Sequence, residues 1–362
     1  MWTRSGTPPT ITSRIRGLFL GLALGDALGS TSEQKAISGK LNAGVATQLA
    51  AWTAEGLLRS ATRYGQLVVQ LDLVRYAYER WVMLRAGASR AEFPHAILDL
   101  DGRTWRGWLF DVPALAEARG SSPSTLKAIR SGGPLPSSGC QGTLRALPVA
   151  GLAVARWLPD EGPRLQVLGR YGQAVCRLTH DHPRAVEATG LAVAIAGSCL
   201  TVEDGIFRAI QSVAYDPAWN TPEIVLRAFH SAQTAPGRVA TLAALAPDSS
   251  GMSALAAGVY SALSFPDQDT TLAALTFAAK APDGDSAAAM CGAFLGASHG
   301  YEALPTNYVS RLELGWVLDR LACDMALQLS ENQAGPGWKT DVFHDDGLRP
   351  LDVWWEVKYP GA

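Results

Sequence analysis

The sequence has few of the features that mark nucleic-acid-binding, membrane or secreted proteins. Its 362 residues carry a net charge of −2, so bulk charge does not favour binding to nucleic acid or another polyanion. No stretch reaches about 18 uninterrupted apolar residues, and residues 1–14 contain no apolar run of signal-peptide length. We therefore expect a cytoplasmic protein without a membrane span and without a nucleic-acid partner.

Cysteine pairs are also missing. The five cysteines are scattered and none belongs to a C-x-x-C motif: Cys140, Cys176, Cys199, Cys291 and Cys323. Scattered thiols indicate a reducing compartment, in which cysteine serves as a small buried side chain. Since no base partner is evident for Cys140, we do not expect a thiol nucleophile.

Alternating strand patterns flanked by hairpin turns are absent, whereas helical spacing is frequent. One stripe of helical spacing consists of Leu67, Leu71, Val74, Tyr78 and Trp81. Residues 183–200 and 285–300 are rich in small side chains that let helices approach closely, and residues 310–330 form another amphipathic helix. With 48% hydrophobic residues, the chain can bury a sizeable core. The sequence predicts an all-α bundle of many helices.

No shift in composition and no internal repeat divides the chain, so residues 1–362 are expected to form one domain. Between Gly87 and Gly142 five prolines interrupt the helical pattern, which predicts a loop-rich surface over a site. Residues 329–362 are polar with aromatic insertions. They are expected to be a C-terminal extension of a core that covers about residues 14–328.

Residues 283–286 read Asp-Gly-Asp-Ser at the start of an apolar helix. Two carboxylates and a hydroxyl at this spacing suit a hard cation such as Mg²⁺ or Mn²⁺. The same residues also suit an N-terminal cap, in which a side-chain oxygen accepts from free backbone N–H groups. Capping is the more common role of such an isolated segment, so both interpretations stay open.

Two further segments carry polar groups with more than one interpretation. His180 and His182 form an H-x-H pair, but no third nitrogen or sulfur ligand lies nearby, so a helix start at Pro183 is favoured over a zinc site. Gly139 and Gly142 would let backbone N–H groups of their loop face an anion or a sugar. A tight loop without a ligand explains the same glycines.

Taken in order, four segments resemble the ADP-ribosylglycohydrolases, the family that includes the dinitrogenase-reductase-activating glycohydrolases. The segments are residues 17–33, 137–154, 178–197 and 281–305. The resemblance implies an all-α, orthogonally packed fold with a binuclear Mg²⁺ or Mn²⁺ site at the bottom of a cleft. It also implies cleavage of ADP-ribose from arginine, serine or ester linkages, or from small molecules.

The resemblance implies roles for individual residues. Asp283, Asp285 and Ser286 match metal-binding residues, and Glu33 matches a glutamate that lies by the scissile bond in some members; a solvated loop carboxylate is its alternative. We expect Glu33, Asp283 and Asp285 to be catalytic and His180 to line the substrate pocket. The substrate-binding loop, with Gln141 where glycine is usual, consists of Ser137, Ser138, Gly139, Cys140, Gln141 and Gly142.

One part of the family pattern is missing. The family usually carries a Thr-Asp-Asp-Thr run just before the helix that corresponds to residues 48–58 here. The aligned positions in this chain are Gly44, Val45, Ala46 and Thr47. Because a dication needs about six oxygen ligands, the loss of two carboxylates makes a two-ion centre improbable. We expect one weakly bound Mg²⁺ or Mn²⁺, or no metal at all. Its ligands would be Asp283, Asp285, Ser286 and Thr47, and Val45 and Ala46 would form an apolar wall.

The sequence thus predicts a divergent hydrolase that cleaves an N- or O-ribosyl or ADP-ribosyl linkage in a protein or an NAD-derived small molecule. Such cleavage passes through an oxocarbenium-like ribose, which a carboxylate must stabilise. Its metal dependence should be reduced or absent. Two alternatives are a catalytically inactive ADP-ribose-binding pseudoenzyme and an inhibitory or immunity-type interaction protein. The sequence predicts no oligomeric state.

Overall fold

The computed structural model describes residues 8–31, 39–64, 69–88, 92–93, 106–120, 122–155, 161–329, 355 and 357–359. Over these residues the chain is helical, and only isolated bridges replace strands. The all-α prediction is confirmed. None of the described helices is long and apolar enough to cross a membrane.

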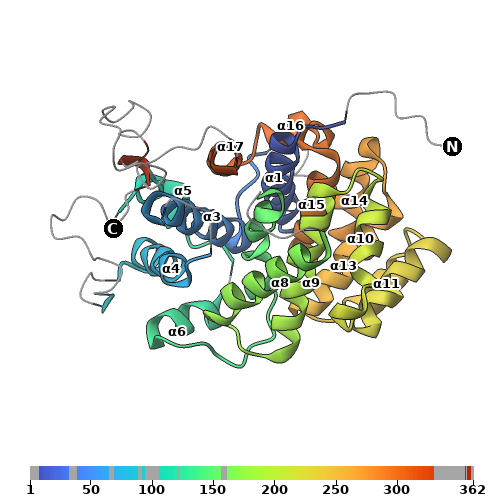
Figure 1. Ribbon diagram of the computed structural model, residues 1–362, viewed down its shortest axis with the longest axis horizontal. Coiled ribbons are helices and arrows are strands. Elements are labelled where there is room, and N and C mark those ends of the chain that lie inside the picture. Colours follow the sequence, from blue (N-terminus) through green and yellow to red (C-terminus); the bar gives the residue numbers. More distant parts are fainter. Residues whose placement is uncertain are drawn as a thin grey trace.

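The longer helices form most of the body of the molecule (Figure 1). They are α1 (Ile11–Gly29), α3 (Val45–Tyr64), α4 (Leu71–Ala86), α8 (Glu161–Arg177), α9 (Pro183–Thr201), α10 (Ile206–Ala214), α11 (Glu223–Thr234), α13 (Gly251–Ser264), α15 (Gly284–His299) and α17 (Gly315–Leu329). The shorter helices are α5 (Pro113–Ala116), α6 (Pro123–Ser131), α7 (Gln141–Leu144), α12 (Val239–Leu245), α14 (Thr271–Ala278) and α16 (Thr306–Val309). The 3-10 turns include η3 (Trp108–Asp111) and η4 (Leu147–Val154).

The predicted helices are present, with one late start. Residues 183–200 form α9 and residues 285–300 form α15, whereas the helix expected from residue 310 begins at Gly315. The late start has a cause, because residues 311–313 pair with Leu41 instead. The Leu41 N–H donates to the Arg311 carbonyl at 3.0 Å, and the Glu313 N–H donates to the Leu41 carbonyl at 2.8 Å. Of the predicted stripe, Leu67 lies outside the described residues.

The centre of the fold is the contact between α1 and α15 (Figure 1). Both helices present glycine to each other, so their backbones touch. A Cβ added at Gly21 would lie 2.0 Å from the Gly292 carbonyl oxygen, and one at Gly25 would lie 2.0 Å from the Ala288 carbonyl oxygen. This contact places the C-terminal end of α1 beside the N-terminal end of α15. Asp26 and Asp285 lie at these two ends.

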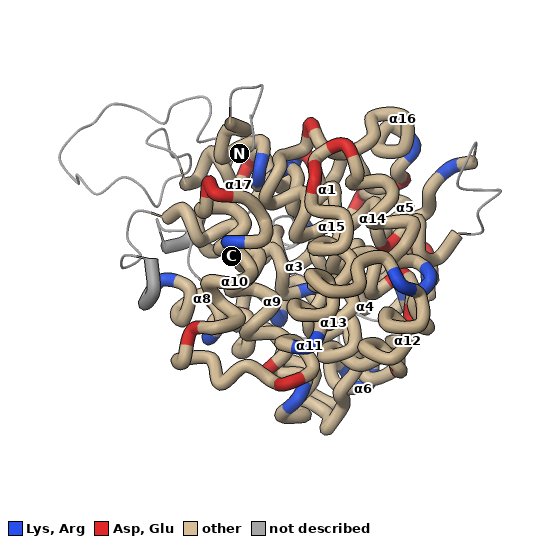
Figure 2. Tube along the Cα trace, turned by 90° about the vertical axis from the view of Figure 1, so that its right-hand side faces the viewer, with Lys and Arg blue, Asp and Glu red and all other residues tan. Residues whose placement is uncertain are grey.

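Most of the buried apolar residues form one large cluster, which runs from Ile15 to Ala326 and includes Trp355 and Tyr359. Part of the predicted C-terminal extension therefore packs onto the core. The Tyr359 hydroxyl donates to Asp324 of α17 at 2.5 Å, and Lys358 forms an ion pair with the same carboxylate. Acidic and basic residues are mixed along the described chain (Figure 2), in keeping with the small net charge.

Candidate active site

A cavity of about 730 Å³ opens where several helices begin. The starts of α3, α6, α7, α13 and α15 all contribute to its wall, together with the end of α1. The free N–H groups and dipoles of helix starts favour anions and oxygen-rich ligands. The lining residues are Ser30, Thr31, residues 42–45, 118–120, 122–124, 137–141, His180, residues 248–250, Asp283, Asp285 and Ser286.

Most of the residues predicted for the site meet in this cavity. Ser137, Ser138, Gly139, Cys140 and Gln141 lie on its wall with His180, Asp283, Asp285 and Ser286. Gly142 lies directly behind the wall, where a Cβ would come within 3.0 Å of the His180 ring. Thr47 is fully buried and does not line the cavity. Glu33 lies outside the described residues, so its predicted role remains a prediction.

The acids at the start of α15 have few partners. Asp283 occupies the N-cap position but makes no side-chain capping bond, and its Oδ2 atom is buried without a hydrogen-bond partner. The interpretation of Asp283 as a side-chain cap of α15 is therefore wrong. Asp285 accepts a hydrogen bond from the Ser286 N–H at 2.8 Å. Burial, and then the charges of Asp283 and Asp26, raise the pKa of Asp285 to about 7.

Asp26, at the end of α1, is bonded to residues 44–47, the segment that carries no acids. Its Oδ2 atom accepts from the Gly44 N–H at 2.9 Å, the Thr47 N–H at 3.1 Å and the Thr47 hydroxyl at 2.5 Å. Asp26 thus caps α3 from outside that helix, and burial raises its pKa against these three bonds. A Cβ at Gly44 would lie 2.3 Å from Asp26 Oδ1, so a larger residue here would force the Asp26 side chain to move.

The residues around Asp283 do not fit a two-ion centre. The Thr47 hydroxyl is bonded to Asp26, and the Ser286 hydroxyl donates to Cys140 Sγ at 3.0 Å. Gly44 and Val45 add no carboxylate to the opposite wall. Over the described parts of the chain, no group of three or more His, Cys, Asp or Glu residues is arranged to hold a metal ion. Asp248 also lines the cavity but accepts from the Ser250 N–H and the Ser253 hydroxyl. The carboxylates of Asp283 and Asp285 remain, and the unpartnered Asp283 Oδ2 atom fits one hydrated cation.

Two backbone N–H groups of the glycine-rich loop are bonded within the protein. The Cys140 N–H donates to the Ser249 carbonyl at 3.0 Å, and the Gly139 N–H donates to the Ser137 hydroxyl at 3.3 Å. The expectation that the backbone N–H groups of this loop are free for a ligand is therefore wrong for Gly139 and Cys140. Burial raises the pKa of the Cys140 thiol well above its usual range, which agrees with the absence of a thiol nucleophile.

His180 is buried, and its Nδ1 atom lies 2.7 Å from the Thr179 hydroxyl. Burial, and secondarily the charge of Arg145, lower the pKa of His180 to about 3. The ring is therefore neutral at physiological pH. His182 instead caps α9 and accepts from the Arg184 N–H, as a plain helix start before Pro183 requires.

The profile of the ADP-ribosylglycohydrolase family matches residues 7–336. The chain belongs to this family. A solved structure described as an ADP-ribosylglycohydrolase-related protein complex has the same fold, with a TM-score of 0.56 and 19% identity over 88% of this chain and 99% of that chain. A comparison with curated proteins finds no match. The family predicted from four short motifs is confirmed. Membership implies ADP-ribosylated substrates.

Residues 118–120 and 122–124 form one side of this ADP-ribosylglycohydrolase cavity. They lie in the segment between Gly87 and Gly142 for which a loop-rich surface over a site was predicted, but no individual residue among them was predicted to face the ligand. Among the described residues that line the cavity, Arg119 is the only Lys or Arg, and its Nε atom is buried without a partner. Ser122 precedes α6, caps no backbone N–H, and has a buried hydroxyl without a partner. The Ser-Pro pair at 122–123 is a helix-start signal and could have placed α6, but nothing local shows that it faces Asp283.

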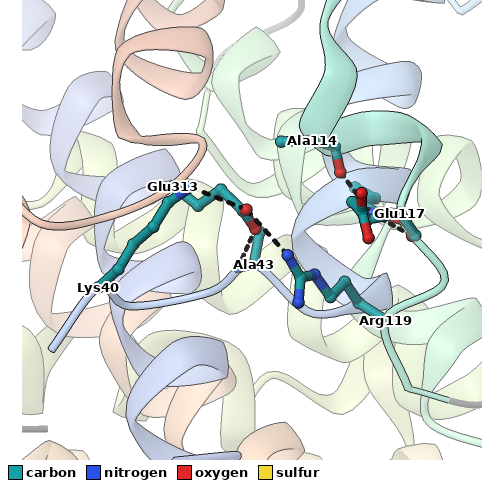
Figure 3. Close-up of polar contacts among 7 residues, drawn as sticks. Lys40, Ala43, Ala114, Glu117, Arg119 and Glu313 are labelled. Atoms are coloured by element: carbon teal, nitrogen blue, oxygen red, sulfur yellow. Dashed lines mark hydrogen bonds and ion pairs between the residues drawn. The ribbon is translucent and has the colours of Figure 1, made fainter. Parts of the chain in front are cut away.

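Glu313 holds Arg119 and the segment at residues 40–43 in place (Figure 3). Its side chain, 4% exposed, accepts from Arg119 Nη2 at 3.0 Å, from Lys40 Nζ at 3.1 Å and from the Ala43 N–H at 3.2 Å. Nearby, Gln48 Nε2 donates to the carbonyls of Ala114 and Glu117. Two segments far apart in sequence, 40–43 and 114–119, are thus tied into one side of the cavity.

Proposed function

We propose that this protein binds a ribosyl or ADP-ribosyl group in the cavity and hydrolyses its glycosidic bond at Asp283 and Asp285. One observation carries the proposal. Four polar atoms of the lining residues are buried without hydrogen-bond partners: Asp283 Oδ2, Ser122 Oγ, Gln141 Oε1 and Arg119 Nε. Buried polar atoms in native proteins nearly always have partners, so the four atoms support a polar ligand that completes them.

The chemistry of these groups matches the parts of an ADP-ribosyl ligand. Arg119, the Ser122 hydroxyl and the start of α6 offer donors and positive charge, which suit phosphate. Asp283 and the Gln141 carbonyl offer acceptors, which suit ribose hydroxyls. The carboxylates also suit the positive charge that develops on ribose C1 when the glycosidic bond breaks.

Asp285 and Asp283 would share the proton transfers. With a pKa of about 7, Asp285 is close to half protonated at neutral pH and can protonate the leaving nitrogen or oxygen as its bond to C1 breaks. Asp283 would stabilise the oxocarbenium-like C1 and take a proton from the water whose oxygen bonds to C1. The hydroxyl of the water is then bonded to C1, the leaving group carries the proton from Asp285, and Asp283 holds the second proton of the water.

One Mg²⁺ bound by Asp283 and Asp285 would neutralise the acid pair and orient ribose hydroxyls. We expect it to bind weakly, because no carboxylate comes from the wall formed by Gly44 and Val45.

Hydrolysis is tested by measuring release of ribose or ADP-ribose from a panel of N-ribosyl and ADP-ribosyl substrates, with and without EDTA. We expect release that persists in EDTA. Asp285→Asn should lower the rate by about 100-fold or more, since an acid–base group contributes that much, while ADP-ribose still binds. Glu33→Gln tests the predicted role of Glu33 in the same assay. Asp269→Asn is the matched control, because Asp269 is exposed and does not line the cavity.

A second function, binding of ADP-ribose without turnover, is favoured by the missing carboxylates at Val45 and Ala46. Tight binding of ADP-ribose, with no release from any substrate in the panel, would establish that function instead. Loss of activity in EDTA with recovery in Mn²⁺ would contradict a metal-independent reaction. Absence of both binding and release would leave the interaction protein as the remaining alternative.

A further inference from the structure

Arg145 is a buried cation directly behind the cavity. Its side chain is fully buried, and no carboxylate pairs with it among the described residues. Its guanidinium donates to the Thr125 hydroxyl at 3.3 Å, to the Cys176 carbonyl at 3.4 Å and to the Thr179 hydroxyl, and it lies over the Tyr78 ring at 4.8 Å. A buried charge held only by neutral groups is costly, which indicates a purpose other than stability.

The bond from Arg145 to Thr179 determines the direction of the next hydrogen bond. Arginine is always a donor, so the Thr179 oxygen accepts from it. The proton of the Thr179 hydroxyl then needs an acceptor, and His180 Nδ1 lies 2.7 Å away. If Nδ1 accepts, the neutral imidazole carries its proton on Nε2. This assignment gives the Thr179 hydroxyl both a donor and an acceptor and leaves the Nε2–H of His180 as a donor without a partner in the part of the chain that the structure describes.

The Nε2 atom faces the glycine-rich loop. A Cβ added at Gly139 would lie 3.6 Å from Nε2, and no hydrogen bond within the described part of the chain uses this nitrogen. The ring is confined, because Gly142 packs against it and the backbone on either side is paired with Leu135. The Leu135 N–H donates to the Thr179 carbonyl at 3.0 Å, and the Asp181 N–H donates to the Leu135 carbonyl at 2.8 Å.

We propose that Arg145 is a positioning residue which, through the Thr179 hydroxyl, holds His180 as an Nε2–H donor to the ligand. The group that His180 meets is then an acceptor oxygen, either a ribose hydroxyl or a phosphoryl oxygen. The ligand part of this inference rests on the proposed function. The hydrogen-bond relay itself concerns only the protein.

The relay is tested in the ligand-free, full-length protein labelled with ¹⁵N-histidine. Two-bond ¹H–¹⁵N spectra distinguish a protonated from an unprotonated ring nitrogen, and His180→Gln identifies the signals of His180. Thr179→Val removes the hydroxyl, Thr179→Ser retains it, and Thr62→Val is the control. The Thr62 hydroxyl is also buried but donates to the Leu58 carbonyl in α3, far from His180.

Wild type, Thr179→Ser and Thr62→Val should show His180 with a protonated Nε2 and an unprotonated Nδ1. In Thr179→Val the Nδ1 signal should move toward the protonated position, as the two tautomers mix. A Thr179→Val spectrum equal to that of wild type would overturn the relay. Arg145→Gln should give the same mixing, and if it fails to fold, Thr179→Val decides alone.

Calorimetric titration with ADP-ribose tests the ligand part separately. Thr179→Val should bind about three- to tenfold more weakly than wild type, the effect of one hydrogen bond, and Thr179→Ser should recover the affinity. Equal affinities of wild type and Thr179→Val would overturn the role of His180 toward ligand. Tautomer mixing in Thr179→Val, together with no binding by wild type, would retain the relay and reject the proposed function.

Discussion

At the scale of residues, the Asp26 carboxylate is bonded to the segment that lacks the acids usual in the family. Its Oδ2 atom accepts three hydrogen bonds from Gly44 and Thr47 at the start of α3. An oxygen atom with three donors around it is a poor ligand for a cation. Asp26 and the start of α3 therefore form one local hydrogen-bonded arrangement.

Replacing Gly44 tests whether the Asp26 side chain is held against it. Gly44→Ala should lower the free energy of unfolding by about 1–3 kcal/mol, because its Cβ would lie 2.3 Å from Asp26 Oδ1. Gly133→Ala is the matched control, since nothing lies within 4 Å of a Cβ there. Urea unfolding of both variants and wild type gives the comparison. Equal stability of the two variants would show that Asp26 is not held against Gly44.

The acid pair gives a pH prediction. The pKa of Asp285 is about 7 in the folded protein against an ordinary 3.8, so between these values the folded state binds a proton that the unfolded chain has released. This contribution to stability is complete below pH 4 and is lost as the pH rises through 7. Asp285→Asn should therefore exceed wild type in stability at pH 8, by up to about 4 kcal/mol, and approach it at low pH. Urea unfolding at pH 5, 6.5 and 8 measures the difference, and a difference independent of pH would contradict the raised pKa.

At the scale of elements, the helices could be predicted from the sequence, but the contacts between distant segments could not. Helical spacing and small residues predicted α9 and α15 nearly to their ends, since a helix depends on contacts three and four residues apart. The pairing of Leu41 with residues 311–313 has no such local signal. The same limit hid Arg119 and Ser122, whose side of the cavity depends on the Glu313 side chain far along the sequence.

The glycine contact between α1 and α15 gives a prediction at this scale. Gly25→Ala should cost about 3 kcal/mol or more, because its Cβ would lie 2.0 Å from a backbone oxygen of Ala288 that no rotamer change can move. It should also weaken ADP-ribose binding in whatever fraction stays folded, since Asp26 and Asp285 lie at the ends of these helices. Chemical unfolding and calorimetry measure the two effects. Native stability in Gly25→Ala would mean that the helices lie farther apart.

At the scale of the whole molecule, the predicted site residues came together in one cavity because the motifs that carry them lie at helix starts which the fold gathers. The four motifs were sufficient to place Asp283, Asp285, His180 and the loop at 137–141. They were not sufficient to predict which backbone N–H groups of the loop stay free for a ligand. The Cys140 N–H is bonded to the Ser249 carbonyl, and Ser249 belongs to a segment without any recognised motif.

Ligands should stabilise the whole molecule by mass action. ADP-ribose at 100 times its Kd should add about 2.7 kcal/mol and raise the Tm by a few degrees. Mg²⁺ alone should raise the Tm less, and more at pH 8 than at pH 6, because Asp285 must lose its proton to bind the ion. Thermal unfolding with each ligand added separately measures these shifts. A Mg²⁺ effect that is larger at pH 6 would contradict the assignment of Asp285 as a ligand.

The backbone contact between α1 and α15 also has a consequence for synthesis. The glycine face of α1 is complete when residue 29 has left the ribosome, yet the helix that covers it ends at residue 299. During synthesis of residues 30–283 the glycine face of α1 therefore lacks the helix that covers it, although α3, α9 and η4, which also contact α1, emerge earlier. Exposed apolar surface of this kind favours transient non-native contacts until α15 emerges. The cavity, which needs the ends of both helices, can first bind a ligand only after α15 has been synthesised.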